Sequence, residues 1–441
     1  MAQRAAAHGF SLARIGGDAA IIVGGALTSN AFNYLYHFII SRRLGPDGYG
    51  TLATLAAAAT ILAVFGGTIG IVAMQDTARL WATNRSEHVG PFVRAVAPAA
   101  LLAALVIAAI SFVAGVLAGP YLHIVRLSLW GAFGAYLALT IFSGFFRGAA
   151  QGAHRFGLFA ASTIGETACK LVSALVLVAA GFAVLGALGG FVIGALVGLC
   201  IVALPLAAPR GDAATTAQHD HLELGGRALS VLWISACVLM LLFMDQLFAK
   251  HHLDGADAGY YGAAGTIART IPFGVGMISL VMAPKAAAAL HVSRDLLRRL
   301  LALTFGAGAA LALAGFAIAA LVPAQLLSIT YGPSFAQAQY LLREYAGAEA
   351  LLAVDSLGIA YLQAIGSYRI TIALITAVVV EALLMAAFGT SGPRIIGIAG
   401  LVNFALVPVV AAYVAVTLRG APQAGGPPPD EALLLDEPRL L

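Results

Sequence analysis

Charged side chains lie inside long apolar runs of this sequence, where each needs a physical reason to be present. Lys170 and Arg269 fall within such runs, and Arg147 directly follows another. An ionisable group at the bilayer centre costs roughly 2.5 to 3.5 kcal/mol on insertion scales. The guanidinium fork suits a phosphate group, and an ammonium adds a mobile point charge. Arg269, Lys170 and Arg147 are therefore candidates for binding an anionic substrate.

Each of these cations also has a structural interpretation. Arg269 could instead form an ion pair with Asp245, Asp355 or another carboxylate. Lys170 follows Glu166 by four residues, a spacing and order that favour a salt bridge on one helix face. The sequence leaves both alternatives open.

Polar side chains recur at helical spacing in two of the runs and flank Arg269 in a third. Spacings of three and four residues place a set of side chains on one helix face, as a water-filled cavity would require. The candidate cavity-lining residues are Asn30, Asn33, His37, Thr163 and Thr266. Four carboxylates within the predicted spans could bind and release H⁺ or Na⁺, or could only pair with arginines: Glu166, Asp245, Asp355 and Glu381.

Motifs for covalent chemistry are not found in the sequence. It has no Walker A motif, no His-Glu-x-x-His and no Gly-x-Ser-x-Gly. The pattern His219-Asp220-His221 lacks further ligands and is interpreted as a solvated loop. We therefore expect no enzyme activity, no cofactor, no metal ion and no direct use of ATP.

The elements that position these residues follow from composition. Of 441 residues, 61% are hydrophobic and 10% are charged, whereas a soluble domain carries about 25% charged residues. Apolar runs of about 20 residues are the length of a transmembrane helix. The sequence thus predicts an all-α integral membrane protein with about twelve spans, at 19–40, 49–74, 95–118, 121–145, 158–180, 183–206, 228–249, 259–283, 300–322, 345–365, 370–390 and 395–418.

The distribution of positive charge predicts the orientation. With the N-terminus inside, inner segments hold 16 and outer segments six of the 24 Lys and Arg residues, while Lys170 and Arg269 lie within spans. Basic residues favour the cytoplasmic side. We expect a multi-pass protein of the inner (plasma) membrane with both termini cytoplasmic. The expected regions are a six-helix lobe at 1–206, a cytoplasmic linker at 207–227, a second lobe at 228–418 and a disordered cytoplasmic tail at 419–441.

An internal repeat supports the two lobes. Leu44-Gly45-Pro46-Asp47-Gly48-Tyr49-Gly50 precedes span two, and a similar segment from Leu253 to Gly262 precedes span eight, with an offset of 211 at the Gly-Tyr pair. Gly152 to Arg155 matches Gly366 to Arg369 at an offset of 214. Two lobes around a site near the midplane are a recurrent transporter architecture, in which rocking of the lobes gives alternating access.

The segment Arg43–Gly50 after a polar-striped helix resembles a signature of polysaccharide (O-antigen type) flippases of the multidrug/oligosaccharidyl-lipid/polysaccharide exporter superfamily. Phe146-Arg147-Gly148 to Arg155 and the Gly259-Tyr260-Tyr261 stretch are also similar to that family. The resemblance covers nearly the whole chain. It implies two six-helix bundles that pass an undecaprenyl-diphosphate-linked oligosaccharide from the cytoplasmic to the outer leaflet.

The resemblance also sets the expected partners. These are a polyprenyl-diphosphate-linked glycan, the lipid bilayer and other envelope polysaccharide assembly proteins, but not nucleic acid. Transport would be coupled to an ion gradient or to the membrane potential. The alternatives are a cation-coupled antiporter of drugs or metabolites and, further away, a membrane glycan ligase or polymerase. Such enzymes generally present a sizeable outer loop, and every outer break in this chain is short.

Overall fold

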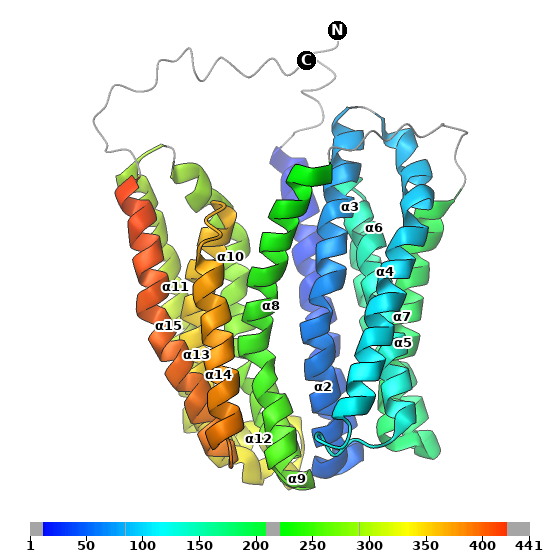
Figure 1. The fold of residues 1–441 in the computed structure, drawn as a ribbon, viewed down its shortest axis with the longest axis vertical. Helices are drawn as coiled ribbons and strands as arrows, with labels where there is room; N and C mark the ends of the chain where they lie inside the picture. The colour runs from blue at the N-terminus through cyan, green and yellow to red at the C-terminus, as the bar shows by residue number, and fades with distance from the viewer. Residues whose placement is uncertain (1–11, 84, 209–220, 291, 421–441) are drawn as a thin grey trace.

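The computed structural model describes residues 12–83, 85–208, 221–290 and 292–420. These residues form two helical lobes that stand side by side (Figure 1). Most of the expected linker, including His219 and Asp220, and all but the first two residues of the expected tail lie outside the described residues. The expected all-α fold with two lobes is confirmed for the described part of the chain.

The first lobe consists of the helices before the linker. They are α2 (Leu12–Leu62), α3 (Val64–Ala82), η1 (Ser86–His88), α4 (Val89–Ala118), α5 (Leu127–Gly152), α6 (Phe156–Leu177), η2 (Val178–Phe182) and α7 (Ala183–Ala207). The chain doubles back inside α2 at Gly45 (φ 69°) and between α6 and α7 at Gly181 (φ 91°). Glycine adopts such positive φ angles without strain, so the chain can reverse its direction at each of these glycines within a very short turn.

The second lobe consists of the helices after the linker. They are α8 (His221–His252), α9 (Gly255–Ala268), α10 (Thr270–Ala289), α11 (Arg294–Leu321), α12 (Pro323–Thr330), η3 (Pro333–Ala338), α13 (Gln339–Ala364), α14 (Ile370–Phe388) and α15 (Gly392–Gly420). The helices α9 and α10 are consecutive, are interrupted at Arg269 and together cover the span predicted at 259–283. Pro272 lacks the N–H that would bond to the Ala268 carbonyl, which weakens the helix there. The short helices α12 and η3 lie in a stretch that the sequence predicts as a loop.

Nine helical stretches among the described residues are long and apolar enough to cross a membrane. Two of them, Ala20–Ala82 and Phe156–Ala207, contain the reversals, so each corresponds to two of the predicted spans. Together with the α9–α10 pair they give the twelve predicted spans. Large apolar side chains such as Leu102, Ile110 and Leu117 of α4 are exposed, as expected of side chains that face lipid.

Glycines bring helices into close contact inside the first lobe. A Cβ on Gly148 of α5 would lie 1.9 Å from the Gly70 carbonyl oxygen of α3, and one on Gly194 of α7 would lie 2.5 Å from the Glu166 carbonyl oxygen of α6. Only a residue without a side chain fits at such distances. Close packing through small residues is typical of membrane helices, where van der Waals contact drives association.

The structure also refines the repeat. His154 (φ 55°) and Gly366 (φ 72°) occupy equivalent positions in two turns of the same type. In each turn the amide of the following residue donates to the carbonyl five residues before it. Tyr49 and Tyr261 are both fully buried. Both pairs are separated by 212 residues, so one offset replaces the values of 211 and 214 taken from the sequence.

Candidate functional site

A cavity of about 260 Å³ lies between the two lobes. The first lobe contributes α2, α5, α6 and α7, and the second contributes α8, α9, α10 and Arg269. The lining residues are Asn30, Asn33, Tyr34, His37, Ala53, Ala56, Ala57, Thr60, Tyr136, Lys170, Phe191, Phe243, Thr266, Arg269 and Phe273. The structure therefore brings together six of the predicted site residues: Asn30, Asn33, His37, Lys170, Thr266 and Arg269. The two charged residues of this lining are both cations.

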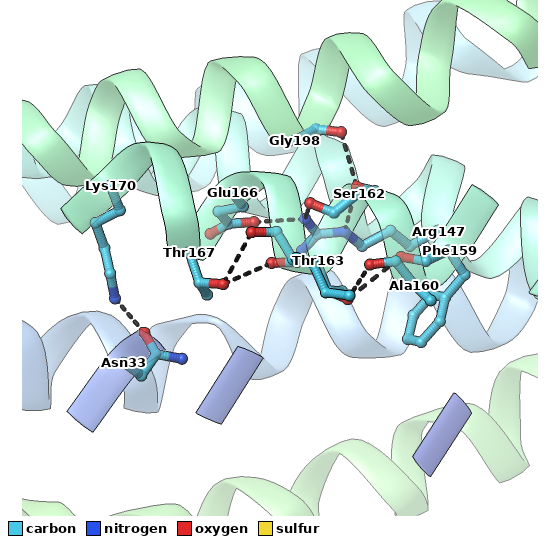
Figure 2. Close-up of polar contacts among 11 residues, drawn as sticks. Asn33, Arg147, Phe159, Ala160, Ser162, Thr163, Glu166, Thr167, Lys170 and Gly198 are labelled. Carbon is cyan, nitrogen blue, oxygen red and sulfur yellow. Dashed lines mark hydrogen bonds and ion pairs between the residues drawn. The ribbon is translucent and has the colours of Figure 1, made fainter. Parts of the chain in front are cut away.

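Lys170 is held by neutral groups. Its Nζ atom donates a hydrogen bond to the Asn33 side-chain oxygen (Figure 2) and lies 4.8 Å from the centre of the Tyr36 ring and 4.5 Å from that of Phe191. Amide oxygens and aromatic faces stabilise an ammonium without cancelling its charge. The alternative of a Glu166–Lys170 salt bridge is wrong for this structure, because Glu166 binds elsewhere.

Glu166 binds Arg147. The Glu166 Oε2 atom lies 2.5 Å from the Arg147 Nη2 atom, and the two side chains are largely buried. Arg147 also donates through Nε to the Ser162 hydroxyl at 3.0 Å. Arg147 does not line the central cavity but a second one of about 340 Å³, which is lined mainly by α3 and α5 and by Phe159 of α6. Thr163 lies in neither lining and bonds to carbonyls of its own helix (Figure 2).

Arg269 is held by carboxylates of the second lobe. Its Nη2 atom lies 2.7 Å from the Asp245 Oδ1 atom of α8, and its Nε atom lies 3.7 Å from the Glu349 Oε1 atom of α13. Tyr345 and Tyr261 both donate hydrogen bonds to Asp245. The structural interpretation of Arg269 as the partner of Asp245 is therefore confirmed. Arg269 therefore has carboxylate partners within 4 Å, whereas Lys170 forms no ion pair with any of the described residues.

The tyrosines of this network were not among the residues predicted from sequence. Tyr345 lies four residues before Glu349 on α13, so both belong to one helix face. A buried polar face of that kind is a signal that could have identified Tyr345. Tyr261 belongs to the repeat segment, where a contact with a carboxylate is not evident from the sequence.

Two further predicted carboxylates lie outside the central cavity lining. Glu381 of α14 is fully buried, and neither of its carboxyl oxygens has a hydrogen-bond partner among the described residues. Asp355 of α13 is buried as well, and its Oδ2 atom has no partner. An ionised carboxylate without a partner in a dry interior is costly. These side chains are therefore suited to holding a proton, while Asp245 serves as a partner of Arg269.

The two copies of the repeat close the cavity at the end where α8 meets α9, at the bottom of Figure 1. A Cβ on Gly259 would lie 1.8 Å from the Pro46 carbonyl oxygen. The Tyr49 hydroxyl bonds to His37 at 3.0 Å and, across the lobes, to Thr266 and Tyr331, each at 3.2 Å. This α8–α9 end is thus sealed by backbone contact and buried aromatic side chains.

Comparisons with known proteins agree with this architecture. The model of a family described as "Polysaccharide biosynthesis protein" matches residues 15–288. An inward-facing conformation of a multidrug resistance MATE family transporter of the MOP superfamily is similar over 89% of this chain and 96% of its own, with a TM-score of 0.71 and 14% identity. An outward-facing conformation of such a transporter is similar over 91% and 94%, with a TM-score of 0.63 and 16% identity. No curated protein matches the chain significantly in sequence.

Proposed function

Because this chain belongs to the polysaccharide biosynthesis protein family, we propose that it is a flippase for a lipid-linked oligosaccharide with a diphosphate head, undecaprenyl diphosphate being the expected carrier. The observation that carries the proposal is the cavity between the lobes, where the described residues that contact the Lys170 ammonium are neutral. Such a head cannot cross a bilayer unaided because its dehydration is too costly. A wet cavity with an uncompensated cation reduces that cost.

The polar residues around Lys170 support the assignment. Asn30, Asn33 and His37 line the same cavity from α2 and can hydrogen-bond to sugar hydroxyls or phosphate oxygens. One ammonium in a hydrated site binds an anion weakly enough to release it on the far side. Arg269 adds long-range positive potential, but its Nε and Nη2 atoms already donate to the Leu242 carbonyl and to Asp245. Lys170 is therefore the proposed phosphate contact.

Alternating access and its coupling belong to the same proposal. The fold is one seen in both inward-facing and outward-facing conformations of MATE transporters, and here the seal lies at the α8–α9 end. With both termini cytoplasmic in an inner membrane, that end would be the outer one. Glu381 and Asp355 are the proposed sites for a coupling ion, H⁺ being the simplest.

A cation-coupled multidrug antiporter is the second candidate, favoured by the multidrug transporters among the structures with this fold. The cavity argues against it. Cationic drugs would need a carboxylate, and the central cavity lining described above contains two cations and no acidic residue.

The deciding experiment uses purified protein in proteoliposomes. It follows transbilayer movement of an undecaprenyl-diphosphate oligosaccharide for the parent and for Lys170→Ala. Movement by the parent that is lost in K170A supports the proposal. Exchange of cationic drugs without movement of the lipid would replace the flippase by the antiporter. Full activity of K170A would show that the phosphate binds elsewhere.

A further inference from the structure

The three charged residues at the α5–α6 contact form an arrangement that helix geometry alone does not favour. Glu166 and Lys170 are one turn apart on α6, in the order that normally gives a salt bridge. In the structure, the Glu166 carboxylate is instead directed to the Arg147 guanidinium, and Lys170 extends away to Asn33 (Figure 2). The Arg147 guanidinium of α5 thus pairs with Glu166 in place of Lys170, the neighbour of Glu166 on α6.

Arg147 is fixed in the position that this requires. Its Nε atom donates to the Ser162 hydroxyl at 3.0 Å and its Nη2 atom to the Ser162 carbonyl at 3.2 Å. The Ser162 hydroxyl in turn donates to the Gly198 carbonyl of α7 at 2.7 Å. A Cβ on Gly198 would lie 2.8 Å from the Glu166 Cβ and 2.9 Å from the Arg147 Nη2 atom. Residues of α5, α6 and α7 therefore hold this ion pair in place.

We propose that Arg147 is a positioning residue, which holds the Glu166 carboxylate away from Lys170 and so leaves the cavity ammonium free to bind phosphate. The inference deepens the proposed flippase function and rests on it. With two cations and one carboxylate in reach of each other, the pairing decides where the net positive charge lies. Pairing Glu166 with Arg147 places that charge at the central cavity.

Loss of Arg147 then has a specific consequence. The Glu166 side chain would turn to Lys170 and neutralise it, although neither residue of that pair had been changed. A residue that bound the substrate directly would behave differently, because removal of Glu166 could not compensate for its loss. A double substitution therefore separates the two roles.

The test measures binding of inorganic pyrophosphate to the full chain in detergent by calorimetry, below the melting temperature of each variant. We expect Arg147→Ala to weaken binding about fivefold, the factor for an ion pair of about 1 kcal/mol. Arg147→Ala combined with Glu166→Gln should return to within about twofold of the parent, and Arg147→Lys should stay close to the parent. Arg94→Ala is the matched control, because the hydrogen bonds of Arg94 to described residues go to the carbonyls of Ala207 and Ala208 through its Nη1 atom.

Three results would overturn the inference. If the double variant binds as weakly as R147A, Arg147 contacts the anion itself. If R147A binds like the parent and only melts earlier, Arg147 serves folding alone. If the parent binds no pyrophosphate, Lys170 is not the free cation assumed. Flipping by the parent is scored separately in proteoliposomes, so failure of the flippase function with the expected binding pattern would leave the positioning role intact.

Discussion

The Gly50 and Gly259 backbones of the two repeat segments are in direct contact across the lobes. A Cβ on Gly50 would lie 2.8 Å from the Gly259 nitrogen. The segments that resemble the flippase signature therefore do not line the central cavity with their glycines but seal its end. This separates the residues that close the cavity from those that contact its contents.

Gly259→Ala tests the seal. Its Cβ would lie 1.8 Å from the Pro46 carbonyl oxygen, so the lobes can no longer approach at the α8–α9 end. We expect a longer mean distance between spin labels at the exposed positions 43 and 257. The distance is measured by double electron–electron resonance after replacement of the three native cysteines. Gly131→Ala is the control, since nothing lies within 4 Å of a Cβ there. An unchanged distance distribution would show that the glycine contact does not hold the lobes together.

Asn33→Asp tests whether the neutrality of the Lys170 partner matters. The substitution keeps the size of the side chain but places a carboxylate beside the ammonium, which removes the free positive charge. We expect about a tenfold loss of pyrophosphate affinity and a parallel loss of flipping, while Asn33→Ala should lose less. Equal losses in both variants would mean that Asn33 acts through its amide alone.

Arg269→Ala and Lys170→Ala should fail in different ways. Removal of Arg269 leaves Asp245 and Glu349 buried without their cation, a change that costs about 3–5 kcal/mol of stability. Lys170→Ala leaves no carboxylate without an ion-pair partner, so it should abolish flipping with a much smaller loss of stability. Thermal unfolding in detergent, read beside the transport assay, distinguishes the two. Similar stability of both variants would contradict the buried network.

Glu381→Gln tests the proposed coupling site. Both carboxyl oxygens lack partners in the interior, so an amide of the same shape should not lower stability and keeps the site permanently neutral. We expect pyrophosphate binding to persist while the stimulation of flipping by a transmembrane pH gradient is lost. Undiminished stimulation in this variant would assign coupling to another group, Asp355 being the next to examine.

Much of the architecture was predictable because its causes are local. A run of about 20 apolar residues has the length of the bilayer wherever it occurs in a chain, and twelve such runs correspond to the twelve crossings. The repeat that pairs Gly48-Tyr49 with Gly259-Tyr260 predicted two lobes. Helical spacing placed Asn30, Asn33 and His37 on one face, and that face lines the central cavity.

Tertiary structure alone decided which cation is free. The sequence made Lys170, Arg269 and Arg147 all candidates, with Arg269 foremost, because charge and hydropathy do not reveal a partner on another helix. The partner of Arg269 is Asp245 of α8, and that of Lys170 is Asn33 of α2. The Glu166 carboxylate, one turn from Lys170, pairs with Arg147 of α5. An ion pair inside a protein depends on distances of a few ångströms between side chains far apart in the chain, and packing of the helices sets those distances.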